Sequence, residues 1–318
     1  METVRPFFIS GFMTELMCHI GQQAVYEEAS ENMKRLTGTE VSGKQIERVC
    51  HYYGQKIEEE EQGLSLKEKE TQYEKNELHY VMMDGGMLLT REEGWKEMKL
   101  CRIFAHDSIE QISKNRRQVS QSKYIGHLGS HHEFWGKVEQ HTDYIQQKII
   151  IADGARWIWK WAEEKCPEAR QILDFYHAKE HLCQFAEEQF EVLKQKQDWI
   201  AWQSHRLLNN QIDDVIADLE AMKPRGGTAC KEKMSLIKYY QANRKRMQYK
   251  TYTENGWLIG SGPIEAAHRH VIQQRMKLSG QRWTLKGAQQ LANLRMASKS
   301  NQWHRVYNAI HNQLPMAA

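Results

Sequence analysis

The pattern of apolar and polar positions begins with a helical section. Residues 10–60 follow the helical period, with one helix predicted over Gln22–Leu36 and a second beginning after Ser42, which can cap it. Two helices joined by a short turn through Gly38 have the outline of a helix-turn-helix. Any small helical bundle contains such pairs, so both interpretations stay open. The charged stretch Glu58–Glu77 predicts a solvated helix or a linker.

The pattern changes to strands at His79. His79–Asp84 predicts a strand that ends in a hairpin turn at Gly85-Gly86. Four further strands are predicted, over Trp95–His106, Ser122–Leu128, Lys148–Ala152 and Ala169–Phe175. Helices are predicted over 134–144, 155–165 and 177–191, and throughout 192–250. Three strands, then strand, helix and strand, then helices, predict an α/β fold with a mixed sheet flanked by helices.

Composition narrows the class of protein. The longest apolar runs, such as Lys148–Ala152, are strand-sized and too short to span a membrane. No secretory signal is visible in the first residues. The six cysteines contain no Cys-x-x-Cys pair, which favours reduced thiols and gives no zinc-finger spacing. We therefore expect a cytoplasmic protein that acts without a membrane partner.

Charge is distributed unevenly along the chain. Residues 223–318 carry 17 basic and 3 acidic side chains, a net charge of +14, although the whole chain carries only +3. Residues 79–222 are acidic, with 18 basic and 23 acidic side chains. A basic segment next to an acidic one favours a bound polyanion, since phosphate contacts need clustered Lys and Arg. The alternative is a solvated basic helical surface.

Three acidic residues stand at the ends of predicted elements. Asp84 follows the first strand, Asp153 follows the fourth, and Glu265 lies in the first turn of a helix that has Pro263 at its start. Ligands in open α/β sheets bind beyond the carboxyl ends of the strands, so the three carboxylates are expected to meet there. Such a set suits Mg²⁺, and two such ions about 4 Å apart support in-line displacement at phosphorus.

Each acid also has a local interpretation. Asp84 with its two glycines can form a turn, Asp153 can cap the next helix, and Glu265 can complement the helix dipole. The combination at one edge favours the metal site. His177 and His181 have helical metal-pair spacing, but Ala178 stands where a zinc protease needs Glu, which excludes that class.

Four motifs, read together, resemble the transposases of the bacterial ISKra4 group of insertion sequences. They are Val81-Met-Met-Asp-Gly-Gly86, Ile149-Ile-Ile-Ala-Asp-Gly-Ala155, Asp174-Phe-Tyr-His-Ala-Lys-Glu-His-Leu182 and Gly260-Ser-Gly-Pro-Ile-Glu-Ala266. The tail from Gln274 to Arg295 is similar as well. The resemblance covers roughly residues 10–300, and its specific motifs begin at residue 79.

The resemblance implies an RNase H-like fold, whose element order the predicted strands and helices follow. It implies a catalytic triad at Asp84, Asp153 and Glu265, and a helical insertion at about 183–250. Asp174 and His177 match a motif that implies a supporting role near the scissile phosphate or flanking DNA. It further implies cleavage of element ends by water and attack of the freed 3′-hydroxyl on target DNA.

The domain organisation predicted on this basis has four parts. A helical region, the possible helix-turn-helix, covers 1–62, and a charged linker covers 63–78. The catalytic domain covers 79–300, and a tail covers 301–318. The resemblance implies more sequence before the position of Met1, so we expect an N-terminally shortened copy that lacks part of what recognises the element ends.

The predicted mechanism uses two Mg²⁺ or Mn²⁺ ions, with Asp84 bridging both, Asp153 holding one and Glu265 the other. Arg269, one turn after Glu265, is expected to face the same edge and hold DNA phosphates. Further DNA-binding candidates are Arg244, Lys245, Arg246, Arg275, Lys277 and Arg282. The expected partner is double-stranded DNA, bound by a homodimer or higher oligomer.

Three alternatives stay open. The first is an inactive or truncated transposase remnant that only binds DNA. The second is a two-metal nuclease without strand transfer, and the third is a helical interaction protein without a site.

Overall fold

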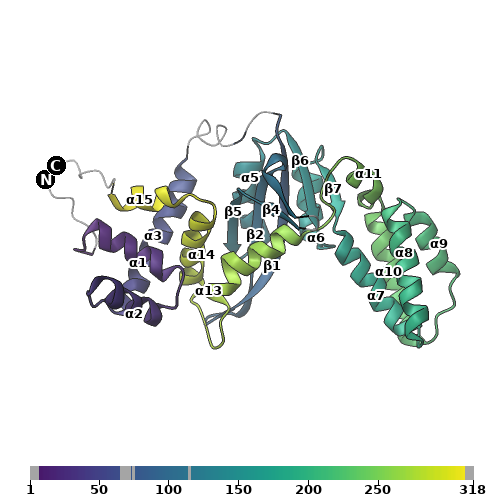
Figure 1. Cartoon of the computed structure of the whole chain (residues 1–318), viewed down its shortest axis with the longest axis horizontal. Coiled ribbons are helices and arrows are strands. Elements are labelled where there is room, and N and C mark those ends of the chain that lie inside the picture. The colour runs from purple at the N-terminus through teal and green to yellow at the C-terminus, as the bar shows by residue number, and fades with distance from the viewer. Residues whose placement is uncertain (1–6, 65–72, 74–75, 114–115, 312–318) are drawn as a thin grey trace. The chain divides into compact units, whose positions relative to one another are not determined.

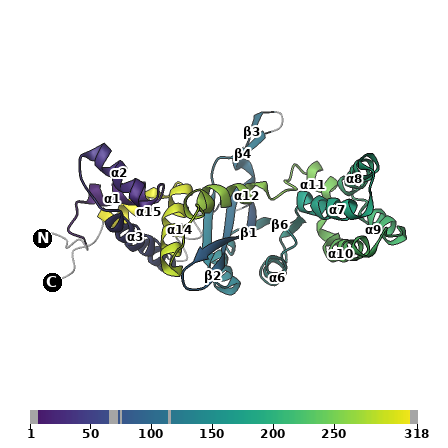
Figure 2. The same cartoon turned by 90° about the horizontal axis from the view of Figure 1, so that it is seen from below.

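The computed structural model describes residues 7–64, 73, 76–113 and 116–311. The chain forms two compact units, one made of Met1–Gln147 with Pro263–Ala318 and the other of Lys148–Gly262. Figures 1 and 2 show the helices and strands of both units. The fold is α/β, with a mixed sheet of five strands in the order β5-β2-β1-β6-β7 and many helices. No helix formed by the described residues is both long and apolar enough to cross a membrane.

The first unit begins with three helices, α1 (Gly11–Gly21), α2 (Tyr26–Thr37) and α3 (Gly43–Gly63). The predicted cap is confirmed, because the Ser42 side chain accepts a hydrogen bond from the Gln45 amide. Gly38 ends α2 in the left-handed region, with φ of 71°, where glycine adds no steric cost. Much of the predicted linker, residues 65–72 and 74–75, lies outside the described residues.

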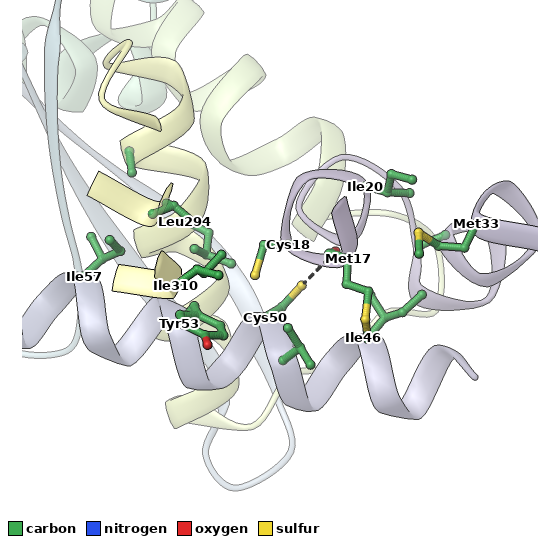
Figure 3. Packing of buried hydrophobic residues seen from close by; sticks show 14 residues of the cluster. Met17, Cys18, Ile20, Met33, Ile46, Cys50, Tyr53, Ile57, Leu294 and Ile310 are labelled. Carbon is green, nitrogen blue, oxygen red and sulfur yellow. Dashed lines mark hydrogen bonds between the residues drawn. The ribbon is translucent and has the colours of Figure 1, made fainter. Parts of the chain in front are cut away.

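The last two helices of the chain pack against the first three. α14 (Leu285–Lys299) and α15 (Trp303–His311) lie against α3, and Leu294, Val306 and Ile310 join its buried core (Figure 3). The sequence interpretation treated 301–318 as a separate tail. Its described part is instead a helix of this bundle, because the apolar face of α15 is buried there; residues 312–318 lie outside the described residues.

α3 and α14 approach closely at a glycine. A Cβ atom added to Gly54 would lie 2.0 Å from the carbonyl oxygen of Gln290, a backbone atom that cannot move away cheaply. The Asn293 amide donates a hydrogen bond to the Gly54 carbonyl across the same contact, at 3.1 Å. The glycine therefore sets the distance between the two helices.

We predict that Gly54→Ala lowers the free energy of unfolding by about 1–3 kcal/mol, because the added methyl group overpacks the contact. Urea unfolding monitored by circular dichroism measures the change. Gly63→Ala is the matched control, since nothing lies within 4 Å of its added Cβ atom. Equal stability of the two variants would contradict the close approach.

The sheet begins with a long hairpin. β1 (Leu78–Thr90) pairs antiparallel with β2 (Gly94–Ala105), and β2 pairs with β5 (Lys123–Leu128). These are the first three predicted strands, although the first is longer than predicted. A small hairpin of β3 (Ile109–Ser113) and β4 (Arg116–Val119) was not predicted, and Figure 2 shows it away from the sheet.

The predicted hairpin turn at Gly85-Gly86 is wrong. Both glycines continue the ladder, Gly85 opposite Lys99 and Gly86 opposite Met98. The chain turns between Thr90 and Gly94, and Gly94 is the residue with positive φ, 68°. Asp84 consequently lies in the middle of β1 and not at its end.

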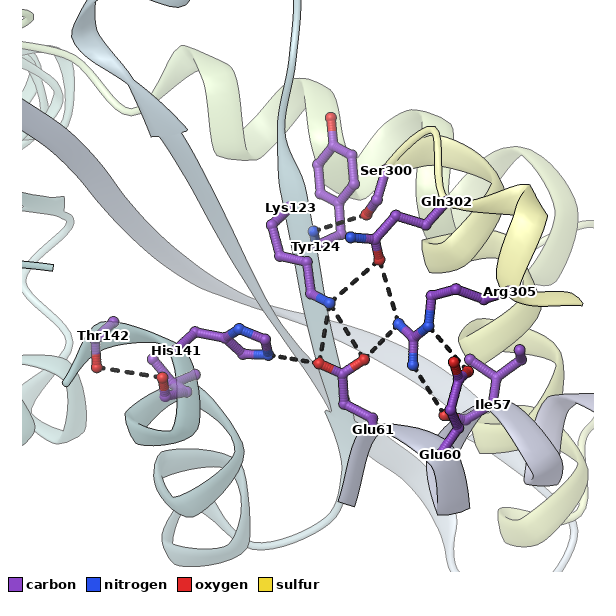
Figure 4. Close-up of polar contacts among 11 residues, drawn as sticks. Ile57, Glu60, Glu61, Lys123, Tyr124, His141, Thr142, Ser300, Gln302 and Arg305 are labelled. Carbon is purple, nitrogen blue, oxygen red and sulfur yellow. Dashed lines mark hydrogen bonds and ion pairs between the residues drawn. The ribbon is translucent and has the colours of Figure 1, made fainter. Parts of the chain in front are cut away.

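A buried ion network connects α3 to β5, α5 (His131–Thr142) and α15 (Figure 4). Glu61 accepts hydrogen bonds from Lys123 at 3.0 and 3.2 Å, lies 2.8 Å from His141 Nε2, and pairs with Arg305. Burial by itself would raise the pKa of Glu61. The three cationic or polar partners instead hold that pKa well below its usual range.

A carboxylate with a lowered folded-state pKa contributes stability above its unfolded pKa of about 4.3, and this stability is lost as the pH falls below that value. Glu61→Gln is therefore expected to cost about 3–5 kcal/mol at pH 7, because Lys123 and Arg305 lose their shared anion. Between pH 5 and pH 3, the free energy of unfolding of the variant should also fall less than that of the unaltered protein.

Urea unfolding at several pH values measures both effects. Glu40→Gln is the control, since Glu40 pairs with Lys34 at an exposed position and contributes less than about 1 kcal/mol. If Glu61→Gln has the same free energy of unfolding as the unaltered protein at pH 7, the network does not stabilise the fold.

The second unit contains the rest of the predicted α/β pattern. β6 (Gln147–Ala152), whose first residue belongs to the first unit, pairs in parallel with β7 (Arg170–Leu173), and α6 (Arg156–Lys165) connects them. The helices after β7 are α7 (Phe175–Gln189), α8 (Leu193–Leu208), α9 (Ile212–Ala221), α10 (Gly227–Asn243) and α11 (Tyr249–Glu254). The predicted helical character of 183–250 is confirmed.

The chain then enters the helix that carries Glu265. α12 (Gly262–Ala267) is followed by a π-helical segment, His268–Gln273, and by α13 (Gln274–Met276). The predicted start, with Pro263 in the first turn, is confirmed. The π-helical segment was not predicted.

Candidate functional site

Asp84 lies on β1 with its side chain about one third exposed. Its Oδ1 accepts a hydrogen bond of 2.7 Å from the Gly85 amide. The Nε2 atom of His268 lies 3.1 Å from the Asp84 carbonyl oxygen and 3.8 Å from Oδ2. The expectation that Asp84 follows the end of the strand is wrong, yet its carboxylate remains accessible.

The helix of Glu265 is fixed to the same strands of the first unit. Arg102 on β2 donates a hydrogen bond of 2.7 Å to the Pro263 carbonyl, two residues before Glu265. His268, three residues after Glu265, is buried and bonds to Asp84. The structure therefore holds the backbone on both sides of exposed Glu265 against the strands that include Asp84.

Gly86, the last residue of the Asp84 motif, makes room for this contact. A Cβ atom at Gly86 would lie 2.9 Å from His268 Nδ1, so a larger residue would push the imidazole away. Because Nε2 faces the Asp84 carbonyl oxygen, it is the ring nitrogen that donates this hydrogen bond.

In the second unit, Asp153 follows β6 directly. Its Oδ1 accepts a hydrogen bond of 2.9 Å from the Ala155 amide, and Ala155, not Asp153, is the N-cap of α6. The capping alternative therefore holds only in part: the carboxylate stabilises the turn that leads into the helix. Its side chain is neither fully buried nor fully exposed.

Asp174 is completely buried and caps α7. Oδ1 accepts from the amides of Tyr176 and His177, at 2.6 and 3.3 Å. Oδ2 accepts from the amide of Ser261, at 2.8 Å, and from its hydroxyl. These four bonds occupy the acceptor positions of a carboxylate. Asp174 thus holds the segment that precedes Glu265 in the chain, and Ser261 is the partner that the sequence did not reveal.

Tyr239 of α10 lies near both aspartates of this unit. A Cβ atom at Gly154 would lie 2.3 Å from the Tyr239 ring, so only glycine fits after Asp153. Burial raises the pKa of Tyr239, and the negative charges of Asp153 and Asp174 raise it further. Its buried hydroxyl has no hydrogen-bond partner among the described residues. No local sequence pattern points to Tyr239.

His177 is half-buried, and its Nδ1 lies 3.4 Å from Glu180 on the next turn of α7. The ring of His181, one turn later, packs against Tyr239 with centroids 4.3 Å apart. The spacing noted in the sequence therefore gives the two histidines different partners, an exposed carboxylate and an aromatic ring.

The basic candidates fall into two groups. Arg269, Lys277, Arg282, Lys245 and Arg244 are exposed, and Arg244 pairs with Asp213. Arg246 and Arg275 are not exposed as the other five are. The Arg246 guanidinium packs 4.3 Å from the Trp159 ring centroid and pairs with Glu163, while Arg275 is only 1 % exposed. The charge pattern alone could not separate packing arginines from exposed ones.

A basic concavity in the second unit was missed at the sequence level. Its lining includes Arg156 and Lys160 on α6 and Lys238 on α10, next to Tyr239 and Gly154. Arg156 and Lys160 are four residues apart and share a helix face, which was the available signal. These cations lie beside the residue that follows Asp153.

The acids are thus organised in two sets. Asp84 and the Glu265 helix belong to the first unit, and Asp153 with Asp174 to the second. No family model matches the chain, and no curated protein matches its sequence. A function for this protein is therefore inferred from its residues and their arrangement.

We predict that Asp174→Ala lowers the free energy of unfolding by about 3 kcal/mol or more, because it leaves the buried donors of Ser261 and the amides of Tyr176 and His177 without an acceptor. Asp153→Ala should cost about 1 kcal/mol or less, since it removes one hydrogen bond at a half-exposed turn. Urea unfolding of the two variants compares them. A larger loss for Asp153 would reverse the structural assignment.

Proposed function

We propose that the protein is a DNA transposase that uses two divalent metal ions, with Asp84, Asp153 and Glu265 as the catalytic carboxylates. The observation that carries the proposal is the attachment of the Glu265 helix to β1 at Asp84 itself, through His268. A carboxylate that only formed a turn or complemented a helix dipole would need no such arrangement. Convergence of Asp153 with the other two acids is part of the proposal.

The element order supports an RNase H-like catalytic domain. Three antiparallel strands come first, followed by two parallel strands that a helix connects, and the helical segment precedes Glu265. This is the order that the resemblance to the ISKra4 group implies. The sheet alone does not specify an activity, so the proposal depends on the acids.

The donor set fits Mg²⁺ or Mn²⁺, because accessible carboxylate oxygens are the ligands these ions prefer. Asp84 would hold both ions, Asp153 one and Glu265 the other. Bound there, the ions would supply an activated attacking oxygen and stabilise the leaving oxygen. Asp174, with all its acceptor positions in use, would position the chain through Ser261 and not bind a metal.

The reaction has two displacements at phosphorus. In the first, a water oxygen forms a bond to the phosphorus at the element end and the 3′ oxygen of the element leaves, taking up a proton. In the second, this 3′-hydroxyl loses its proton and attacks a phosphodiester of target DNA, which releases a target 3′-hydroxyl. Both steps need positioned phosphates more than side-chain chemistry.

Double-stranded DNA is the proposed partner. Exposed Arg269 follows Glu265 by four residues, and Arg156, Lys160 and Lys238 lie beside Gly154. Each set would place positive charge next to a proposed catalytic acid, where it can hold backbone phosphates. A homodimer or higher oligomer would bring two element ends together.

The test is cleavage and strand transfer on labelled DNA that carries the ends of the element, with Mg²⁺ or Mn²⁺. We predict that Glu265→Gln, which keeps the size of the side chain but removes its charge, reduces cleavage and joining by at least about 100-fold. DNA binding should remain. Glu254→Gln, a change at an exposed glutamate in α11, is the control.

The products separate the alternatives. Metal-dependent cutting without joining would identify a nuclease that uses the same acids. Binding without cutting in the unaltered protein would identify a DNA-binding remnant. Activity of Glu265→Gln equal to that of the control would remove Glu265 from the mechanism.

A further inference from the structure

A polar cavity lies in the first unit. Its volume is about 680 Å³, its open mouth included. It is lined by Tyr26 at the start of α2, by Arg275 of α13, and by Arg282 and Trp283 of the segment between α13 and α14. Arg91, from the turn between β1 and β2, adds a third guanidinium.

Arg275 is the buried cation of this cavity. The side chain is among the largest that are fully buried, at 1 % exposure. Nε donates a hydrogen bond of 3.2 Å to the Gly21 carbonyl, and the guanidinium lies 4.8 and 5.4 Å from the ring centroids of Tyr26 and Trp283. Its Nη2 has no acceptor among the residues that the structure describes.

A buried guanidinium without an anionic partner is unfavourable, because the protein does not replace its hydration. Burial correspondingly lowers the pKa of Arg275. The two aromatic rings stabilise the charge but offer no acceptor in the plane of the N–H groups. An anion that entered the cavity would supply that acceptor.

The acidic lining does not neutralise the cavity. Glu47 is its carboxylate, and it pairs with Lys44 at 2.5 Å. Burial lowers the pKa of His51, another lining residue; Glu47 opposes this shift, whereas Lys44 and Arg275 add to it. The arginines that line the cavity, Arg91, Arg275 and Arg282, therefore outnumber its carboxylate, Glu47.

The mouth of the cavity is preformed. The Arg91 amide and the Trp283 amide bond to the Trp283 and Leu89 carbonyls at 2.8 and 3.0 Å, which joins the segment to the end of β1. Arg91 Nε donates to the Arg282 carbonyl at 3.2 Å, and the Trp283 indole donates to Met276 at 2.8 Å. A site that is already ordered binds its ligand with less entropic cost.

From this arrangement we propose that the cavity binds a terminal phosphate group, a phosphate monoester of a nucleotide or of a DNA 5′ end. The gradient of burial selects a monoester: Arg275 is buried, while Arg91 and Arg282 are exposed at the same cavity. A terminal phosphate offers three oxygens on a narrow end, so it can reach Arg275 while the mouth arginines neutralise its second charge. A backbone phosphodiester carries a nucleoside on both sides and therefore has no such narrow end.

The cavity itself does not depend on the proposed transposase activity. The choice of a DNA 5′ end as one source of the phosphate does rest on that proposed function. A free nucleotide is the other source, and the two share the chemistry that the cavity recognises.

The experiment uses the full chain without divalent metal. Binding is measured for the same short oligonucleotide with and without a 5′-phosphate, and thermal unfolding is measured with AMP and with inorganic phosphate. We expect the 5′-phosphate to tighten binding about 10-fold, as charge-assisted hydrogen bonds would. Arg282→Gln and Arg275→Lys should abolish this ratio. Arg35→Gln, which removes an exposed charge on α2, should preserve it.

Each outcome decides the proposal. A rise in unfolding temperature with AMP that both pocket variants lose, without an effect of the 5′-phosphate, supports the site and assigns it to a free nucleotide. No response to 5′-phosphate, AMP or inorganic phosphate overturns it, and so does a response that Arg282→Gln and Arg275→Lys both retain. If Arg275→Lys does not fold, the exposed pair Arg282→Gln and Arg91→Gln gives the answer.

A failure of this proposal is distinguishable from a failure of the proposed function. The binding measurements contain no metal and need no cleavage, so a protein that joins no DNA can still show the phosphate effect. Conversely, strand transfer that depends on Glu265 can occur in a protein whose cavity does not bind phosphate.

Discussion

The first unit depends on how one helix is attached to two strands. The helix that starts with Pro263 is fixed to β2 by the Arg102 guanidinium and to β1 by the His268 imidazole, and both side chains are buried. A buried donor of this kind must find its acceptor, because leaving it unpaired costs as much as losing the hydrogen bond. The position of Glu265 relative to Asp84 follows from these two requirements, and the glycine at position 86 follows from the second.

The acids of the chain differ in how much of their bonding capacity the fold uses. Asp174 is buried, and its carboxylate oxygens accept hydrogen bonds from three backbone amides and one hydroxyl. Asp84 and Glu265 remain accessible on their elements, and Asp153 has one short-range amide bond. The accessible acids can therefore still accept a new ligand, whereas buried Asp174 stabilises a turn. The sequence alone does not separate these two kinds of acid.

Much of the fold could be predicted from the sequence because local patterns determine it. Ser42 caps its helix as a short side chain before an apolar period should, and the apolar run at Lys148–Ala152 is a buried strand. The errors occur where a distant contact decides. Gly85 and Gly86 carry a turn signal, but pairing with β2 and the approach of His268, more than 180 residues away, keep them in a strand. Arg275 carries a surface signal, but Tyr26 and Trp283 enclose it. The partners Ser261 and Tyr239 are likewise defined by packing between segments, which no local pattern encodes.

The π-helical segment at His268–Gln273 changes how the chain can vary during evolution. A π-helical turn contains an extra residue relative to an α-helix, so the side chains after it are rotated with respect to those before it. This rotation lets one continuous helical path direct His268 to the sheet and Arg275 to the helical bundle. Loss of a single residue there would turn everything downstream by about 100° and separate the two contacts. Single substitutions at positions other than His268 leave the direction of both contacts unchanged, whereas a change of length does not, so the residue count of the segment should be under stronger selection than the composition of the rest of it.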